Sequence, residues 1–192
     1  FKHNRGESNK ECTDRTFTPN YSISEPIDNH HLPIRLNIIS DSDFSLELGL
    51  IDVPKDLLKK QKDQIIVIAS SAIGASKYTY SFERLIPNSI TYFPIGGIPA
   101  EKYTLNSDPA IQLYWPSRID GIKSRGKLFD TNMCKDIPED SDVLNDKDYY
   151  LLCADLSIEL EVNESINIER ISQKRINAKT WSVFRIRSLL LS

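Results

Sequence analysis

Residues 121–128, GIKSRGKL, have the spacing of a phosphate-binding loop as far as Lys127. Such a loop surrounds phosphate oxygens with backbone N–H groups, and a hydroxyl directly after the lysine holds the magnesium ion. Leu128 stands where that hydroxyl is needed, and the segment from Lys127 to Phe129 has the pattern of a strand instead of a helix. We therefore expect a basic turn followed by a strand, and no nucleotide cofactor.

Oxygen ligands gather between residues 136 and 148, where acidic side chains outnumber the single lysine. Asp140 and Asp142 fit the first two positions of a helix-flanked calcium loop, but Leu144 stands at the third and the turn glycine is absent. We expect no bound metal ion, and we interpret the segment as a solvated or partner-facing acidic loop between two strands. An irregular calcium site in this loop is the alternative.

The residue types that act as bases and nucleophiles form no recognisable catalytic set. The histidines, His3, His30 and His31, lie near the N-terminus, and adjacent residues of an extended chain point in opposite directions. The serines of residues 70–77, SSAIGASK, match no nucleophile elbow and no serine–lysine motif. We therefore expect a protein that is not an enzyme, and an enzyme with scattered site residues is an alternative.

Three cysteines, Cys12, Cys134 and Cys153, allow at most one disulfide within the chain. Their spacing fits neither a zinc site nor a redox pair. Any of the three pairings is open. The pairing of Cys12 with Cys134 is favoured because both lie in irregular segments, whereas Cys153 lies within a predicted strand, where free cysteines are usually buried.

Tyr92 and Tyr114 are the aromatic residues best placed to contact another molecule. A strand over residues 111–115 would direct Tyr114 away from its apolar neighbours, and Tyr92 lies beside a predicted loop at residues 94–99. Tyrosine and arginine are frequent among the residues that dominate protein interfaces. The predicted partner-binding residues are therefore Tyr92, Tyr114 and Arg118 together with the acidic residues Glu139, Asp140, Asp142, Asp146 and Asp148.

The elements that position these residues are predicted to be strands. In residues 149–162, YYLLCADLSIELEV, every second residue from Tyr150 is apolar, while the other register changes from apolar to acidic after Cys153. This pattern predicts a long strand that is covered on both faces in its first half and exposed on one face in its second half.

Other apolar runs with strand patterns recur along the chain, with turn residues between them. They lie at residues 34–39, 44–50, 64–69, 78–83, 111–115, 165–170 and 181–187. The last run changes phase between Val183 and Phe184, which predicts a bulge. Short helices are expected at 54–62 and 171–179. The chain is thus predicted to be all-β and mostly antiparallel, a β-sandwich or partly open barrel with one or two short helices.

The composition is that of an ordinary globular protein, with 192 residues, 40% apolar residues and a net charge of -3. Residues 1–16 are predicted to be a flexible polar tail, and residues 17–192 a single β-rich domain. The net charge does not favour nucleic acid, and no apolar run is long enough to span a membrane. A polar start at Phe1 is expected after removal of a signal peptide or N-terminal anchor, which predicts a periplasmic or extracellular protein; a shortened cytosolic protein is the alternative.

These features together predict a non-enzymatic module that binds another protein outside the cytoplasm. The most specific expectation is a bacterial immunity or inhibitor protein that occludes a secreted toxin, with the acidic loop complementing a basic cleft. No motif in the chain identifies a family. A small-ligand or glycan-binding β domain that uses a sheet face or barrel mouth is an alternative.

Overall fold

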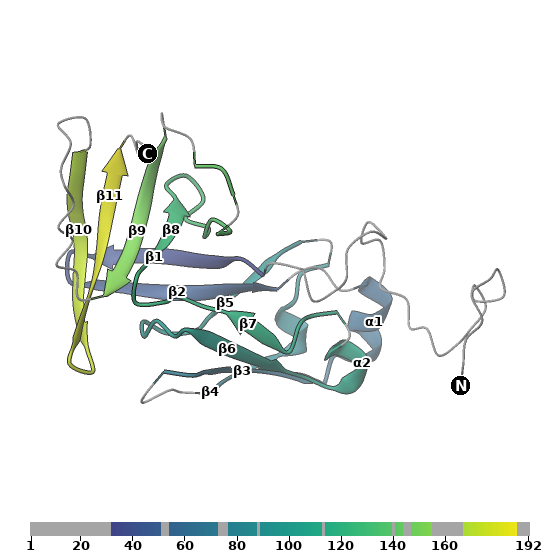
Figure 1. Ribbon diagram of the computed structural model, residues 1–192. Helices are drawn as coiled ribbons and strands as arrows, with labels where there is room; N and C mark the ends of the chain where they lie inside the picture. The colour runs from purple at the N-terminus through teal and green to yellow at the C-terminus, as the bar shows by residue number, and fades with distance from the viewer. Residues whose placement is uncertain are drawn as a thin grey trace, which may run out of the picture.

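The computed structural model describes residues 32–50, 54–72, 77–87, 89–112, 114–139, 141–143, 147–154 and 167–187. The described strands form three antiparallel sheets, accompanied by short helices (Figure 1). The predicted all-β, mostly antiparallel fold class is therefore confirmed. The tail predicted at residues 1–16 lies outside the described residues.

The first sheet has the strand order β1-β2-β5. Its strands are β1 (Ile34–Ser40), β2 (Asp43–Leu50) and β5 (Thr91–Pro94). The period-two pattern of β2 places Phe44, Leu46 and Leu48 on one face, where all three are fully buried. Leu46 pairs with Leu36 of β1, so the apolar registers of the two strands face the core together, as the sequence predicts.

The middle sheet has the strand order β4-β3-β6-β7. Its strands are β3 (Ile65–Ser70), β4 (Lys77–Ser81), β6 (Lys102–Asn106) and β7 (Arg118–Asp120). Ile66, Ile68 and Leu105 form its buried face. The ring of Tyr80 lies 5.0 Å from that of Phe93 on β5, measured between centroids, so this face packs against the first sheet.

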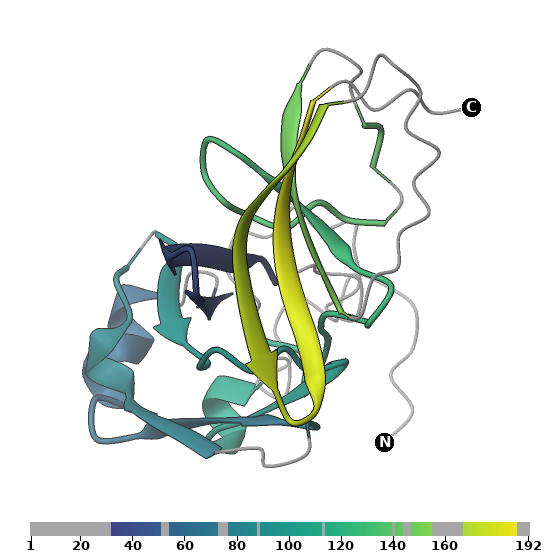
Figure 2. The same cartoon turned by 90° about the vertical axis from the view of Figure 1, so that its left-hand side faces the viewer.

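The C-terminal sheet has the strand order β10-β11-β9-β8, and its strands run across those of the first sheet (Figure 1). Its strands are β8 (Lys127–Asp130), β9 (Asp148–Ala154), β10 (Asn167–Ile176) and β11 (Lys179–Arg187). Figure 2 shows the long β10–β11 hairpin in front of the other two sheets. Phe129, Leu152 and Val183 contribute its fully buried side chains to the common core.

Residues 134–137 join the first sheet to the C-terminal sheet. On one side the N–H of Leu36 in β1 donates to the carbonyl oxygen of Cys134 at 2.9 Å. On the other side the N–H of Ile137 donates to the carbonyl oxygen of Leu128 in β8, also at 2.9 Å. The segment therefore continues the hydrogen bonding from β1 to β8, and a single buried cluster draws side chains from all three sheets.

The helices are short and lie away from the C-terminal sheet (Figure 1). They are α1 (Lys55–Lys60), the 3-10 helix η3 (Phe82–Arg84) and α2 (Pro109–Gln112). The predicted helix at 54–62 is confirmed by α1, which follows Pro54 and carries lysines in its last turn. No helix in the described part of the chain is long and apolar enough to cross a bilayer.

The predicted strand at 111–115 is wrong. Residues Pro109–Gln112 form α2, because proline suits the first turn of a helix and the chain then turns before β7. Tyr114 and Trp115 are both buried, so the alternation that would have turned Tyr114 away from its apolar neighbours does not occur.

The predicted helix at 171–179 is also wrong. Strand β10 continues to Ile176, a two-residue turn follows, and β11 starts at Lys179. The turn residues Asn177 and Ala178 have φ of 48° and 66°, which is the left-handed conformation that a tight hairpin turn requires. Pairing with β11 thus determines the structure of residues that have little strand pattern of their own.

The bulge predicted from the phase change at Val183 lies in the neighbouring strand. The pairing of β11 with β9 is continuous, whereas the pairing of β10 with β11 shifts between Arg170 and Ser172. The extra residue is therefore in β10, at the level of Val183 and Phe184.

The first half of the predicted strand at 149–162 is confirmed by β9. Tyr149 and Cys153 in one register, and Leu152 and Ala154 in the other, are all buried, so both faces are covered as predicted. Residues 155–162, which were predicted to continue the strand, lie outside the described residues.

Candidate functional site

Glu139, a residue of the predicted acidic loop, lies beside the turn that connects β7 to β8. The Glu139 carboxylate lies 3.4 Å from Lys123 Nζ and 3.3 Å from Arg125 Nη2 of that turn. The positive charge of Lys123 is the largest cause that lowers the pKa of Glu139. Asp142 is exposed, whereas Asp140 lies outside the described residues.

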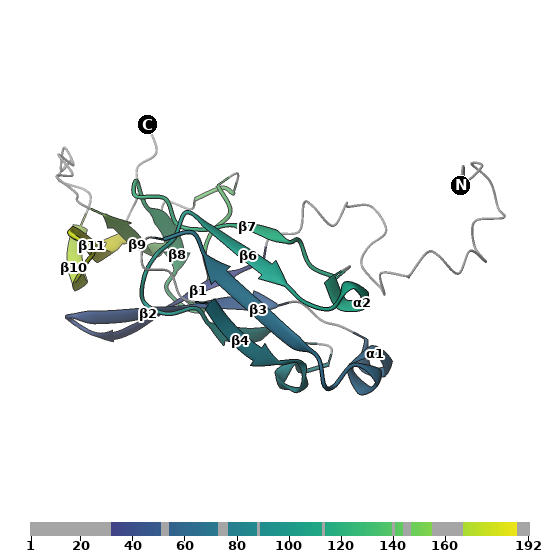
Figure 3. The same cartoon turned by 90° about the horizontal axis from the view of Figure 1, so that it is seen from below.

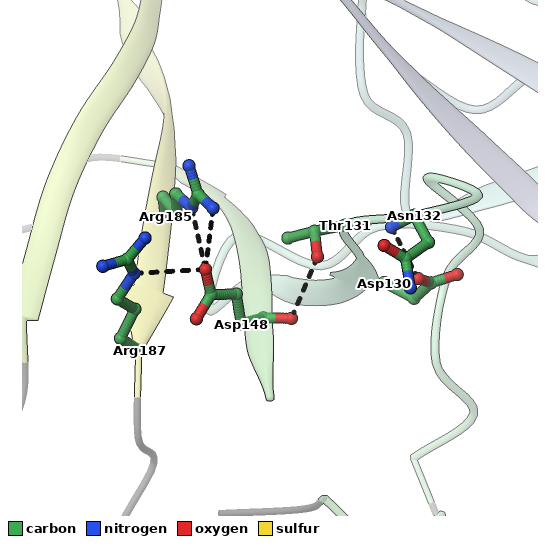
Figure 4. Close-up of polar contacts among 6 residues, drawn as sticks. All are labelled: Asp130, Thr131, Asn132, Asp148, Arg185 and Arg187. Atoms are coloured by element: carbon green, nitrogen blue, oxygen red, sulfur yellow. Dashed lines mark hydrogen bonds and ion pairs between the residues drawn. The ribbon is translucent and has the colours of Figure 1, made fainter. Parts of the chain in front are cut away.

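Asp148, the first residue of β9, lies between two arginines of β11 (Figure 4). Its Oδ2 accepts hydrogen bonds from Arg185 Nε at 3.0 Å, Arg185 Nη2 at 2.8 Å and Arg187 Nε at 3.2 Å. The hydrogen bonds from Arg185 are the main reason that the pKa of Asp148 is lowered. The pairing of Asp148 with Arg187 across the strands sets this arrangement. Asp146 lies outside the described residues.

The acidic side chains at these two places are therefore paired with basic side chains of the same chain. A basic partner would have to compete with Lys123 and Arg125 for Glu139, and with Arg185 and Arg187 for Asp148. Ion pairs that stay in contact with solvent stabilise a protein only weakly, so such competition is energetically feasible. The acidic partner-binding loop stays a prediction.

Tyr92, Tyr114 and Arg118 do not come together in one patch. Tyr114 belongs to the core, and burial raises its pKa. Tyr92 lies on β5, on the face of the first sheet that points away from the middle sheet, where the Arg35 guanidinium lies 4.0 Å from the centre of its ring. Arg35 also donates to Glu47 at 2.6 Å. Its guanidinium group therefore already contacts two side chains of the same sheet, Tyr92 and Glu47.

Arg118 lies on the face of the middle sheet that points away from the core, which we call the open face. Figure 3 looks onto this face, and no described element lies over it. Alternate residues of a strand point to opposite sides, so the residues between the buried positions form it. They are Ile65, Val67, Ala69, Lys77, Thr79, Ser81, Lys102, Thr104, Asn106, Arg118 and Asp120.

The centre of the open face is apolar. Ile65, Val67 and Ala69 follow one another along β3, and the Ile65 side chain is 51% exposed. Val67 pairs with Thr79 on one side and with Asn106 on the other, so short polar side chains flank the aliphatic ones. The three side chains form a stripe along an inner strand of the sheet.

The charged residues of the open face lie around this stripe. Lys77 pairs with Ala69 at the end of β3, and Arg118 pairs with Thr104 near the β7 edge. Lys102 stands opposite Asp120. Three basic residues against one acidic residue leave the rim with an excess of positive charge.

The residues predicted from nucleotide and metal motifs have other roles. Lys127 lies 3.0 Å from Asp136 Oδ2 in a buried ion pair, and residues 121–126 form a turn before β8, as the sequence predicts. Within the described residues, no group of three or more histidine, cysteine, aspartate or glutamate side chains could hold a metal ion. Cys134 and Cys153 are not bonded to each other, and Cys12 lies outside the described residues.

The sequence did contain a signal for the open face. The run QIIVIA was predicted as an apolar strand, and its neighbour KYTYS has a polar register of Lys77, Thr79 and Ser81. The sequence alone does not show which residues of the two strands stand opposite each other. It therefore did not place these polar residues beside Ile65, Val67 and Ala69. No protein-family model, curated protein or solved structure matches the chain.

Proposed function

We propose that the protein is a binding module for another protein, and that the open face is its docking surface. The observation that carries this proposal is the aliphatic stripe of Ile65, Val67 and Ala69 at the centre of a face surrounded by polar and charged side chains. Protein interfaces have this anatomy, with an apolar centre from which water is excluded and a polar rim. A sheet is also rigid, so little conformational entropy is lost when it docks.

The charge of the rim favours a partner with acidic residues around an apolar contact. Lys77 and Arg118 have no ion-pair partner among the described residues, so both are available to a partner. Complementary charges at a rim speed association and select among partners more than they tighten the complex. The partner should therefore bind more slowly at high salt, with a smaller change in its dissociation rate.

The specific form of the proposal is a bacterial immunity or inhibitor protein that occludes a secreted toxin outside the cytoplasm. Occlusion requires a surface that covers the toxin's site, and it requires no catalytic group in the inhibitor. The open face supports the covering role, because its apolar centre and charged rim can exclude water from a partner's surface.

Affinity capture with matched variants tests the docking surface. The full chain and its Ile65→Lys, Arg118→Glu and Ile86→Lys variants serve as baits against culture extract and supernatant. Ile86 is 56% exposed and lies outside the open face, which makes it a control for the 51% exposed Ile65. We expect a partner that binds the wild type and Ile86→Lys, and that is lost or weakened at least tenfold with Ile65→Lys.

The purified complex then tests the inhibitory role. Toxicity or enzymatic activity of the captured protein should fall when the wild-type chain is added in equal amount and should return with Ile65→Lys. A partner that binds Ile65→Lys and Arg118→Glu as well as the wild type would show that the open face is not the interface. A partner whose activity is unchanged in the complex would contradict the inhibitor proposal while leaving the docking surface in place.

A further inference from the structure

A surface pocket of about 270 Å³ lies where the tip of the β10–β11 hairpin meets the end of the middle sheet. Four chain segments that are distant in sequence form its walls, namely residues 71–72, 98–101, 122–124 and 176–181. Its volume is close to the lower end of the range for small-molecule sites, which suits a ligand of a few heavy atoms. The pocket is separate from the open face, because its walls come from the strand ends and connecting segments.

The floor of the pocket is apolar. Ile122, Ile176 and Trp181 line it and are themselves almost fully buried in the protein. Trp181 is 6% exposed, so only a small part of its side chain is available to a ligand, and a broad ring face is not. This geometry fits a compact aliphatic group better than a sugar ring, which stacks on an open aromatic face.

Two opposite charges stand on different walls of the same pocket. Lys179 rises from the start of β11, and its Nζ donates to the Ser124 hydroxyl at 3.2 Å, which holds the ammonium group beside the pocket. Glu101 stands on the wall that precedes β6. Both side chains are exposed, and no ion pair joins them in the described part of the chain. A ligand can therefore contact both charges without breaking an existing pair.

We propose that this pocket binds a small zwitterion with an aliphatic body, the chemical class of the free apolar α-amino acids. The ligand carboxylate contacts Lys179, its ammonium group contacts Glu101, and its side chain covers the floor at Ile122 and Trp181. The hydroxyl of Ser71 on the same wall as Glu101 adds a polar group for the ligand's head. This site is independent of protein docking at the open face.

Titration of the full chain with L-leucine, followed by NMR of its backbone amides and Trp181 indole, tests the proposal. We expect saturable shifts at residues 98–101, 122–124 and 176–181. Two analogues of leucine test its two charged groups one at a time: 4-methylpentanoate lacks the amino group, and 3-methylbutylamine lacks the carboxylate. Each should bind roughly threefold to fivefold more weakly than leucine, because one exposed ion pair is lost.

Variants assign each charge to its wall. Lys179→Gln should weaken leucine and 4-methylpentanoate roughly threefold to fivefold and leave 3-methylbutylamine unchanged, and Glu101→Gln should show the reverse pattern. Lys77→Gln, on the open face, is the matched control and should bind leucine as the wild type does. The proposal is overturned if leucine causes no saturable shifts up to its solubility limit, or if both analogues bind as tightly as leucine.

Discussion

Asp136 is a charged residue at the junction of two sheets, and its side chain is completely buried. Its Oδ1 accepts the N–H of Ile34 at 2.8 Å, and its Oδ2 lies 3.0 Å from Lys127 Nζ. The carboxylate thus contacts β1 and β8 at once. Burying a charge is costly unless it is paired and hydrogen-bonded, and this geometry supplies both kinds of partner.

Replacing Asp136 with alanine should destabilise the protein by about 3–5 kcal/mol, because Lys127 would keep a buried charge without its partner and Ile34 would lose its acceptor. Chemical denaturation of the two proteins measures the difference. Asp142→Ala, at an exposed position, is the control and should change the free energy of unfolding by less than about 0.5 kcal/mol. Equal effects of the two substitutions would contradict this account of Asp136.

The lowered pKa values of the ion-paired residues Asp148 and Glu139 indicate how the stability of the protein should depend on pH. The pKa of Asp148 is lowered mainly by hydrogen bonds from Arg185, and that of Glu139 mainly by the charge of Lys123. A carboxyl group with a lowered pKa in the folded state stabilises the protein above its unfolded-state pKa, and this contribution is lost as the pH falls through the folded-state pKa.

Stability should therefore be constant near neutral pH and should fall below about pH 4. Asp148→Asn should be less stable than the wild type at pH 6, and the two proteins should become more similar in stability at pH 3. Thermal unfolding at both pH values measures this. A stability difference that is the same at pH 6 and pH 3 would show that the loss does not come from the Asp148 charge.

Cys153 of β9 is buried opposite Ser182 of β11, and burial raises the pKa of its thiol to about 12. Cys134 is half-buried, and its pKa is also raised chiefly by burial. Since the thiolate is the reactive form, Cys153 should resist iodoacetamide at pH 8 until the protein unfolds, and Cys134 should react first. Peptide mapping of alkylated sites over time checks the order. Labelling of Cys153 in the native protein at the rate of Cys134 would be the contrary result.

At the scale of elements, the connection after β7 depends on a close approach of two backbones. The N–H of Gly121 donates to the Glu101 carbonyl at 2.8 Å, and the N–H of Ile122 donates to the Ala100 carbonyl at 2.7 Å. A Cβ on Gly121 would overlap the carbonyl oxygen of Ala100 and would lie 2.8 Å from the Tyr103 ring. Neither group is the end of a flexible side chain, so the backbones would have to separate.

Gly121→Ala should accordingly destabilise the protein by about 1–3 kcal/mol. Asn106→Ala, on the exposed side of the neighbouring β6, is the control and should have little effect. Urea denaturation measures both. If Gly121→Ala is as stable as the wild type, the two backbones do not approach as closely as described.

Elements were predictable from sequence where a strict alternation coincides with one buried face. Strands β1 and β2 follow such patterns, because burial of every second residue is a local consequence of the strand conformation. The two segments whose secondary structure was predicted wrongly have no strict alternation that matches one buried face. Residues 171–176 become a strand through pairing with β11, and residues 109–112 become a helix despite an apolar run. These outcomes depend on strand pairing and on turn formation, which the pattern of apolar residues does not reveal.

The candidate site was less predictable than the fold for the same reason. Composition drew attention to the acidic residues and tyrosines, but the structure pairs Glu139 and Asp148 with basic residues and buries Tyr114. The open face is formed by strands from residues 65–120, whose order in the sheet differs from their order in the sequence. Which residues share a face therefore depended on topology, and Arg118 was the one predicted residue that lies on it.

At the scale of the whole molecule, three sheets share one buried cluster, and residues 134–137 bond to two of them. The β10–β11 hairpin also contacts the β1–β2 turn, where Lys174 Nζ lies 2.6 Å from Asp43 Oδ1. Contacts of this kind tie the C-terminal sheet to the rest of the protein at two separate places. Unfolding one sheet would expose the apolar faces of the others, so the sheets should unfold together.

The two tryptophans allow this cooperativity to be tested. Trp115 packs against Phe82, with ring centroids 6.4 Å apart, near the middle sheet, whereas Trp181 lies on β11 in the C-terminal sheet. Trp115→Phe and Trp181→Phe each leave one fluorescent reporter, on a different sheet. In each variant, the urea transition followed by tryptophan fluorescence should coincide with that followed by far-ultraviolet circular dichroism, because a cooperative unit loses all its structure at once.

Comparing two signals within one variant removes the effect of the substitution on stability. A fluorescence transition that precedes the dichroism transition in the Trp181 reporter alone would show that the C-terminal sheet unfolds separately, and would divide the predicted domain of residues 17–192 in two.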